Sequence, residues 1–260
     1  MKLIETITPK GITPDKPSPL QASVLKHYSK EALWWLNDIV KHYTIDDDGT
    51  VNTQVSVILD RSDYSEFPVK FGKIDGDFKC RHMANLKKLN GPSYVKGAFD
   101  LEGCYSLRSL ENGPEYVGSF IDLTSCESLK NLKGGPKKVD ASYILDYCEN
   151  LTSLEGIADE ITSRASVGWL SMRHCNNLTK IDFIPRKVGP TKIIIGSTPV
   201  KNLLILLEIP NLKKVDIDEN GKLIEILQKY LKEPIVHKRN MLNCQDELIE
   251  AGFEEFAEVD

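Results

Sequence analysis

Hydrophobic residues recur along this chain in a fixed register. Five twelve-residue segments share one template, with apolar side chains at positions one and three, cysteine or methionine at six, and leucine or isoleucine at nine and twelve. The segments begin at Phe78, Phe99, Ile121, Tyr143 and Leu170. Three shorter copies begin at Val55, Ile193 and Val215, so that successive starts fall 21 to 27 residues apart. A repeat of this length indicates a chain built from stacked structural units.

The template also predicts the shape of each unit. Apolar and variable residues alternate at its start, which is typical of a short strand with one buried face. The sixth position turns the chain, the two leucines point inward from the return leg, and linkers such as NGPSYVKGA add a Gly-Pro turn and one inward valine. A unit of about 22 residues cannot bury its own apolar edge, so the units must stack. We therefore expect an α/β repeat fold, a leucine-rich-repeat-like solenoid of about eight coils with a parallel sheet on one side and helical N- and C-terminal caps.

Four regions follow from this reading. Residues 1–19 contain four prolines and are expected to form an extended arm. Residues 20–54 are expected to form a helical and hairpin cap, because apolar side chains recur there at helical spacing before the turn sequence DDDG. Residues 55–220 are the solenoid, and residues 221–260 are a C-terminal helical cap. Such atypical ends would cover the apolar edges of the first and last coils.

The repeats, with the form C-x-x-L-x-S-L-x-G-x-P, resemble bacterial and phage leucine-rich repeats that carry Asn or Cys at the ladder position. With WLNDIVKHYTIDDDGTVN from Trp35, FPVKFGKIDGDF from Phe67 and CQDELIEAG from Cys244, the chain is similar to an uncharacterised family from tailed bacteriophages. The resemblance spans about Trp34 to Gly252. It implies a phage-encoded protein that acts inside an infected bacterium. It supplies no catalytic residues, because a fold does not define an activity.

Composition and charge narrow the class of protein. The 260 residues are 41% hydrophobic and 27% charged, which excludes wholesale disorder. A net charge of -5 without a basic run argues against a nucleic acid partner. The most apolar stretch, Leu203–Ile209, is far shorter than the roughly 18 residues of a membrane span, and MKLIETITPK lacks a signal-peptide core. We expect a cytoplasmic protein (in the host cytoplasm if phage-encoded) with reduced cysteines and no membrane contact.

The candidate metal ligands are better explained by structural roles than by metal binding. Zinc ligands converge on a point, whereas the cysteines at the sixth template position should form a line, and Met83 occupies the same position. These cysteines are Cys104, Cys126, Cys148 and Cys175. Asp46, Asp47 and Asp48 lack the spacing of a calcium loop, so a solvated turn is favoured. We expect no metal and no cofactor. For Phe253 and Phe256, packing on the last coil is favoured over a partner-docking tail.

The variable strand positions should face outward, where specificity can vary without disturbing the fold. They include Lys79, Arg81, Asp100, Glu102, Asp122, Thr124, Ile144, Asp146, Ser171, Arg173, Ile194, Asp216 and Asp218, and Phe120, Tyr147 and Trp169 border the strands. Asp100 and Asp122 are expected to lie side by side on neighbouring coils. This face has unevenly distributed acids and aromatic residues, which are common at protein interfaces.

Two classes of function fit this face. The first is a non-enzymatic protein-interaction module, a monomer or weak oligomer, that binds the basic surface of a host protein through Asp100, Glu102, Asp122, Asp146, Tyr147 and Trp169. The second is a groove-type hydrolase or lyase that uses the carboxylates of Asp100, Asp122 and Asp146. The motifs G-x-S-x-G, H-E-x-x-H and the phosphate-binding loop do not occur in the sequence, which favours the first hypothesis. The acids can also serve only to keep the solenoid soluble.

Overall fold

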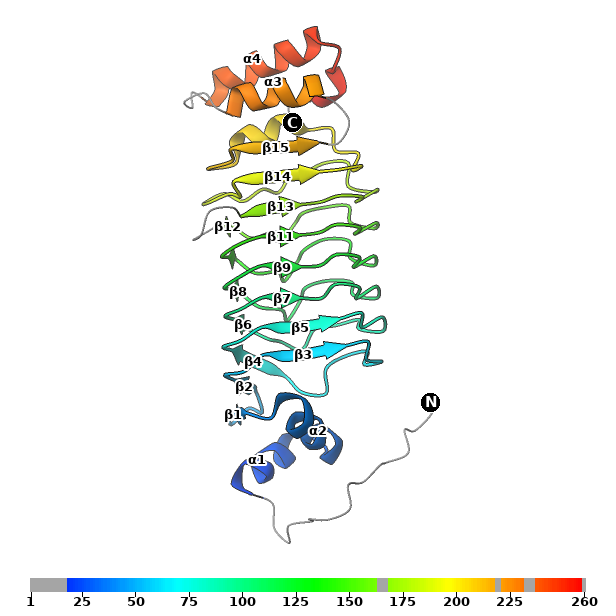
Figure 1. The fold of residues 1–260 in the computed structure, drawn as a ribbon, viewed down its shortest axis with the longest axis vertical. Helices are drawn as coiled ribbons and strands as arrows, with labels where there is room; N and C mark the ends of the chain where they lie inside the picture. The colour runs from blue at the N-terminus through cyan, green and yellow to red at the C-terminus, as the bar shows by residue number, and fades with distance from the viewer. Residues whose placement is uncertain (1–17, 163–167, 218–220, 232–236, 259–260) are drawn as a thin grey trace.

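The computed structural model describes residues 18–162, 168–217, 221–231 and 237–258, in which stacked coils form a long column with helices at both ends (Figure 1). One face of the column is an eight-stranded sheet, here called sheet B. Its strands are β3 (Val57–Asp60), β5 (Phe78–Arg81), β7 (Phe99–Asp100), β9 (Ile121–Asp122), β11 (Tyr143–Ile144), β13 (Trp169–Ser171), β14 (Lys192–Ile195) and β15 (Lys214–Ile217). Seven steps separate these eight strands, so the chain is a parallel β-solenoid of about seven turns.

The template places these strands correctly except at the first coil. Val57, not Val55, pairs with Phe78, so the first interval is shorter than expected. Val57 and Leu59 are both buried and continue the inward positions of Phe78 and Cys80. Val55 is only half-buried and lies in the bend that precedes β3. Since valines stand at both positions, alternation alone does not separate the two registers.

The expectation of a sheet on one side only is wrong, because the linkers form a second sheet, here called sheet A. Its strands are β1 (Tyr43–Ile45), β2 (Val51–Thr53), β4 (Phe71–Ile74), β6 (Tyr94–Val95), β8 (Tyr116–Val117), β10 (Lys138–Val139) and β12 (Glu160–Ile161). Coils of nearly equal length bring equivalent linkers to the separation at which strands hydrogen-bond. The single inward valine of each linker is the buried half of a two-residue strand. Within the described residues β1–β2 is the one antiparallel strand pair, as the hairpin turn predicts.

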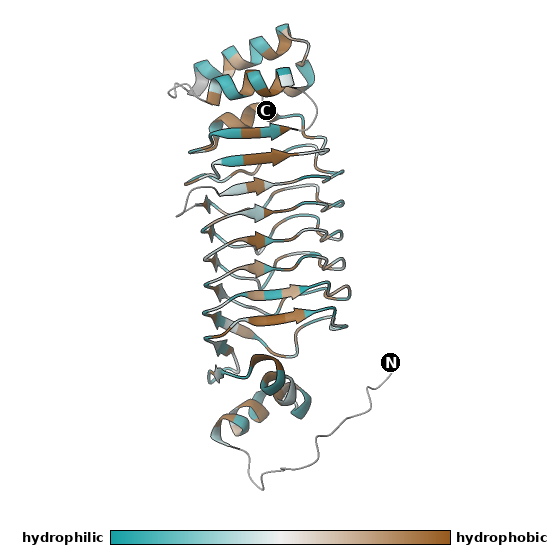
Figure 2. Ribbon diagram, viewed as in Figure 1, coloured by the Kyte–Doolittle hydropathy of each residue, from teal (hydrophilic) through white to brown (hydrophobic). Residues whose placement is uncertain are grey.

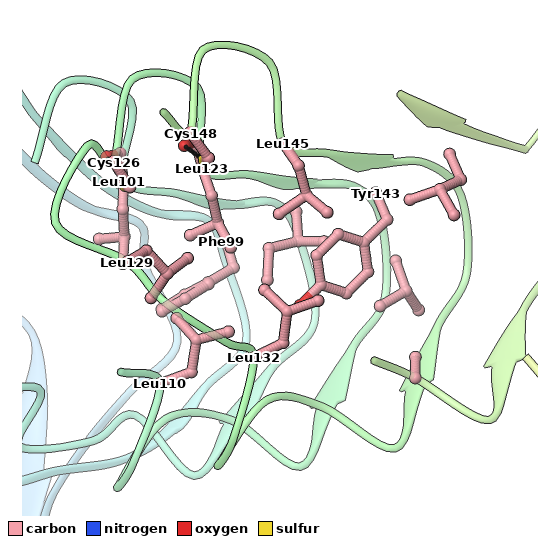
Figure 3. Close-up of a cluster of buried hydrophobic side chains, with 14 of the residues drawn as sticks. Phe99, Leu101, Leu110, Leu123, Cys126, Leu129, Leu132, Tyr143, Leu145 and Cys148 are labelled. Carbon is pink, nitrogen blue, oxygen red and sulfur yellow. Dashed lines mark hydrogen bonds between the residues drawn. The ribbon is translucent and has the colours of Figure 1, made fainter. Parts of the chain in front are cut away.

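The core runs between the two sheets along the length of the column. Figure 3 shows Phe99 and Tyr143 from sheet B facing Leu110, Leu129 and Leu132 from the return legs. These side chains are fully buried. Burial of each such side chain contributes about 1.5–3 kcal/mol. The repeat of apolar positions in the sequence therefore becomes one continuous core shared by all coils.

Helices lie beyond the first and last coils. They are α1 (Pro19–His27), α2 (Lys30–Trp35) and the π-helix η1 (Leu36–Val40) at one end, and α3 (Gly221–Leu231), α4 (His237–Glu250) and the 3-10 helix η3 (Glu254–Phe256) at the other. The 3-10 helix η2 (Leu203–Glu208) lies within the coil that joins β14 to β15. Each of the four α-helices carries hydrophobic and hydrophilic residues (Figure 2), and α3 buries its apolar side chains next to β15. None of the described helices has the length and apolar character needed to cross a bilayer.

Two expectations concern residues that lie outside the described ranges. Of the proline-rich arm over residues 1–19, residues 1–17 lie outside them, while Ser18 is the N-cap of α1 and Pro19 its first residue. Ser18 and Gln21 form a capping box, which explains why the helix begins there. Asp218 also lies outside the described residues.

Candidate functional site

The candidate site is the outward face of sheet B. Strand pairing places one outward residue from each coil in a single row, namely Ile58, Lys79, Asp100, Asp122, Ile144, Ser171, Ile194 and Asp216. Asp100 and Asp122 are partners in this register, as the sequence predicts. Exposure varies strongly along the row, from 61% for Ile58 to none for Asp100. The face is therefore not the uniform solvated surface that strand alternation suggests.

Asp100 differs most from its expected state. The sequence predicts an exposed outward acid, but the side chain is fully buried. Arg81 from the preceding coil lies over it and donates hydrogen bonds from Nε at 2.8 Å and Nη2 at 2.5 Å to Oδ2. The backbone N–H of Glu102 donates to Oδ1 at 3.2 Å, and the Glu102 carboxylate lies 3.7 Å from Arg81 Nε. A charge taken out of water requires such partners, so Asp100 orients Arg81 rather than meeting solvent directly.

Asp122 lacks such a cation. Its Oδ1 accepts a hydrogen bond from the Thr124 backbone N–H at 2.9 Å, and no Lys or Arg of the described residues lies within ion-pair distance. Burial raises the pKa of Asp122, and the nearby charges of Asp100 and Glu102 raise it further, against the hydrogen bonds from Thr124. Asp122 is thus a half-buried carboxyl with a pKa above its ordinary value.

Asp146 is held by its neighbours on the next coil. Its Oδ1 accepts from Ser171 Oγ at 2.6 Å and from the Arg173 backbone N–H at 2.9 Å. The Arg173 guanidinium lies 3.8 Å from Oδ2. Like Asp100, this carboxylate is paired inside the protein. The acids do not form one patch of free negative charge, and Asp122 is the one of the four without a Lys or Arg of the described residues at ion-pair distance.

Two exposed aromatic side chains border the acids at the C-terminal half of sheet B, from opposite ends of the strands: Trp169 begins β13, whereas Tyr147 follows β11. Tyr147 is 47% exposed and Trp169 is 38% exposed. The Tyr147 ring stacks on His174 from the next coil, with centroids 4.5 Å apart and planes 18° from parallel. This contact was not predicted from the sequence, although Tyr147 and His174 share the fifth template position on neighbouring coils. Arg173 precedes His174 in the chain, and tyrosine, tryptophan and arginine are the residue types that dominate protein interfaces.

The fifth template position has an unusual backbone throughout the solenoid. Its residues adopt left-handed φ values between 50° and 72° in seven coils, at Arg61, His82, Gly103, Ser125, Tyr147, His174 and Ser197. Six of the seven are not glycine, for which this conformation costs energy. The turn after each strand is therefore imposed by the stacking of coils. The same constraint fixes the backbone that carries Tyr147 and His174.

The cysteine ladder is a row of hydrogen-bond donors. Each thiol donates to the backbone carbonyl of the inward residue at the third template position of the preceding coil, at 3.1 to 3.4 Å, and the donors are Cys104, Cys126, Cys148 and Cys175. Thr198, which stands in a decayed repeat, makes the same contact with the Met172 carbonyl. All six cysteines are free and buried, as expected for structural thiols. Burial raises the pKa of Cys104 and of Cys175 to about 12, so neither is a reactive thiolate.

The described grooves lie away from the outward face of sheet B. One of about 760 Å³ is lined by η2, α3 and the tail, including Leu203, Leu223 and Phe256. Another of about 720 Å³ is lined by β1 and β2, including Tyr43 and Thr53. Phe253 and Phe256 are partly buried against the core, which confirms the packing interpretation of the tail. No protein-family model, curated protein or solved structure matches the chain.

Proposed function

We propose that this protein is a non-enzymatic interaction module that binds another protein through the outward face of sheet B. The observation that carries the proposal is the pair of exposed aromatic side chains, Tyr147 and Trp169, with Tyr147 held by its stack on His174. A ring whose position is already fixed loses little conformational entropy on binding. Aromatic and arginine side chains of this kind supply most of the energy of protein interfaces.

The acids have different roles in this proposal. Glu102 and Asp122 meet the partner's basic residues at the border of the contact, where charge guides approach more than it adds affinity. Asp100 acts indirectly, because it holds Arg81 in place from below. Asp146 similarly orients Arg173, which precedes His174 of the Tyr147–His174 stack. All six predicted residues thus keep a part in binding, with Tyr147 and Trp169 as the central contacts.

The resemblance of the chain to phage repeat proteins indicates the class of partner. The cysteine-containing repeats and the flanking motifs support a leucine-rich-repeat-like phage protein, and its partner would then be a protein of the bacterial host cytoplasm. In such a solenoid the terminal helices are caps. The apolar side chains that α3 buries next to β15 support that role.

The test combines capture and substitution. The tagged protein is used to capture a partner from bacterial lysate, and the purified pair is titrated with Tyr147→Ala and Trp169→Ala. We expect each variant to weaken binding at least tenfold while keeping its melting temperature. Trp34→Ala is the matched control, because Trp34 is a 58% exposed tryptophan on α2, outside the face. If only the Trp34 variant loses binding, the site lies on the N-terminal helices instead.

One observation favours a second function, the hydrolase or lyase. Asp122 is a half-buried carboxyl with a raised pKa, and no Lys or Arg of the described residues lies within ion-pair distance of it, which suits a general acid. Acidic and neutral polysaccharides would be incubated with the wild type and with Asp122→Asn. Chain cleavage that the Asn variant abolishes would establish this activity and displace the interaction module as the primary function.

A further inference from the structure

The Tyr147 ring has one face in contact with another ring and one face that is open. The first face stacks on His174 from the next coil, with the two ring planes only 18° from parallel. The opposite face, here called the free face, is therefore turned along the column toward the preceding coil, where Ser125 occupies the equivalent position. Among the described residues, no aromatic ring or cation lies against the free face, and Tyr147 is 47% exposed.

The row of fifth template positions has only small residues on the side of the free face. Gly103 and Ser125 stand between His82 and Tyr147 in this row. The His82 ring lies over Gly103, because a Cβ added there would be 2.8 Å from Cδ2 of that ring. At the level of Ser125 the row therefore presents no large side chain, and successive levels are about 4.8 Å apart. A planar group from another molecule can enter at this level and lie on the free face.

Sheet A shows what completes a stack of this kind. Tyr94 and Tyr116 stack on neighbouring coils, with centroids 5.0 Å apart and planes 19° from parallel. From the preceding coil, Lys73 places its Nζ 5.6 Å from the centroid of the Tyr94 ring. The order along the column is thus cation, ring, ring. In the fifth-position row the order is serine, Tyr147, His174, so a serine occupies the place that Lys73 takes in sheet A.

Acidic residues adjoin the level of Ser125 on consecutive coils. Glu102, Thr124 and Asp146 form a row at the fourth template position. The row is held in register because the Gly103 N–H donates to the Thr124 carbonyl and the Ser125 N–H to the Asp146 carbonyl, each at 2.8 Å. A group that enters at the level of Ser125 therefore has a carboxylate on the coil before it and another on the coil after it.

The acids here outnumber the cations that pair with them. Asp122 lies on the same coil as Ser125 and accepts a hydrogen bond from the Thr124 N–H at 2.9 Å. Together with Asp100 and the two acids of the row, it makes four carboxylates, and two guanidinium groups, those of Arg81 and Arg173, lie within ion-pair distance of them. Two negative charges are left over, so the surface favours a cationic group.

We propose that the partner protein inserts an arginine side chain at the level of Ser125, where its guanidinium lies on the free face of Tyr147 and pairs with Asp122 and Glu102. This inference rests on the proposed function, because it names the group that the outward face of sheet B receives. Arginine fits better than lysine, since a planar guanidinium can lie flat on a ring while it donates hydrogen bonds to carboxylates at its edge. The charges of Asp100 and Glu102 contribute to the raised pKa of Asp122, and an arriving cation offsets that repulsion.

The first test supplies the guanidinium from within the chain. Ser125→Arg puts an arginine where Lys73 stands in sheet A, and Arg61 shows that the fifth position accepts arginine, with a φ of 53°. We expect this variant to keep its melting temperature and to weaken binding of the captured partner at least about tenfold. Ser197→Arg is the matched control, because Ser197 has a φ of 50° at the same position on the far side of His174. Unchanged binding by Ser125→Arg, or an equal loss in the control, overturns the proposal.

A peptide titration identifies the group that binds. The probes are a capped Gly-Arg-Gly peptide and its counterparts with lysine and with citrulline, which keeps the shape of arginine without its charge. Each is titrated into isotope-labelled protein at low salt while the amide resonances of Ser125 and Tyr147 are followed by NMR. We expect saturable shifts with the arginine peptide, weaker binding of the lysine peptide, no binding of the citrulline peptide, and loss of the response in Tyr147→Ala. An arginine peptide that shifts neither resonance, or that binds no better than its counterparts, overturns the proposal.

Failure of this inference can be told apart from failure of the proposed function. If Tyr147→Ala weakens binding of the captured partner and Ser125→Arg does not, the interaction module stands and the inserted arginine is wrong. If neither variant changes binding, the partner contacts another surface and both proposals are wrong.

Discussion

The Sγ of Cys126 lies 3.4 Å from the carbonyl oxygen of Leu101 and donates a hydrogen bond to it across one coil boundary. Cys148 makes the same contact with Leu123, and Thr198 replaces the thiol by a hydroxyl at the equivalent position. In five coils the ladder side chain is therefore small and donates a hydrogen bond, and Met83 is an exception. The ladder position does not simply select a soft apolar group, as the methionine at that position suggests from the sequence.

This contact predicts different outcomes for two substitutions of Cys126. Cys126→Ala removes the donor and leaves the Leu101 carbonyl without this partner, whereas Cys126→Thr keeps a donor of the kind seen at Thr198. We expect the alanine variant to be about 1 kcal/mol less stable than the threonine variant, in line with the net value of a buried hydrogen bond. Urea unfolding followed by circular dichroism measures the difference. Equal stability of the two variants would show that the position only fills space.

The Tyr143 hydroxyl predicts that its removal increases the stability of the protein. The ring occupies an inward position that Phe78 and Phe99 fill on other coils, and the side chain is fully buried. Its hydroxyl has no hydrogen-bond partner among the described residues. Since burial of an unpaired polar group costs about 1–3 kcal/mol, Tyr143→Phe should increase the free energy of unfolding by about 1 kcal/mol. Thermal and urea denaturation would check this, and a lower stability of the phenylalanine variant would contradict it.

The burial of Asp100 changes what charge reversal should do. An exposed acid beside Asp122 would tolerate lysine or gain stability from it. Because Asp100 is fully buried beneath Arg81, Asp100→Lys instead places an unpaired positive charge against a guanidinium. An unpaired charge at a fully buried position costs on the order of several kcal/mol, and we expect a loss of this order. Asp216→Lys is a suitable control, because Asp216 occupies the same row and is partly exposed. Similar melting temperatures for the two variants would argue against the buried pair.

These cases show what the repeat could and could not predict. Spacing located seven of the eight sheet B strands, since the inward residues are dictated by a shared core. It missed sheet A because two-residue strands such as Tyr94–Val95 are too short to show alternation. The repeat also predicted the wrong exposure for Asp100, because the outward position of a residue does not show whether a long side chain from the neighbouring coil, here Arg81, covers it. The repeat register alone is enough to predict that Tyr147 stacks on His174. The left-handed turn that presents both rings cannot be predicted in this way, because it arises from the stacking of the coils.

Asp122 predicts a specific dependence of stability on pH. A carboxyl whose folded-state pKa is raised binds more protons in the folded than in the unfolded state between its ordinary and its raised pKa. Stability therefore falls as the pH rises through that window, which begins near the ordinary value of about 4. Asp122→Asn removes this contribution. The wild type should be closest in stability to the variant at the acidic end of the window and fall behind it as the pH increases. Urea denaturation at pH steps from 4 to 7 measures the gap, and a constant gap would contradict the raised pKa.

The fifth template position offers the most direct test of how the solenoid imposes its backbone. Gly103 has a φ of 72°, and a Cβ added there would lie 2.8 Å from Cδ2 of His82 on the preceding coil. That His82 ring is held by a 2.9 Å contact between its Nδ1 and Asp60 Oδ1. Gly103→Ala therefore meets both a left-handed backbone, which costs about 1–2 kcal/mol for a residue with a Cβ, and a close contact. We expect a loss of stability of about 2 kcal/mol.

Ser125 is the matched control for this prediction. It adopts a φ of 59° at the same position of the next coil, but it already carries a Cβ. Ser125→Gly relieves the left-handed strain while increasing the entropy of the unfolded chain, and these two effects largely cancel. Its stability should therefore stay within about 0.5 kcal/mol of the wild type. If Gly103→Ala were equally neutral, the turn after β7 would have room for a side chain, and the His82 ring would not be the element that requires glycine there.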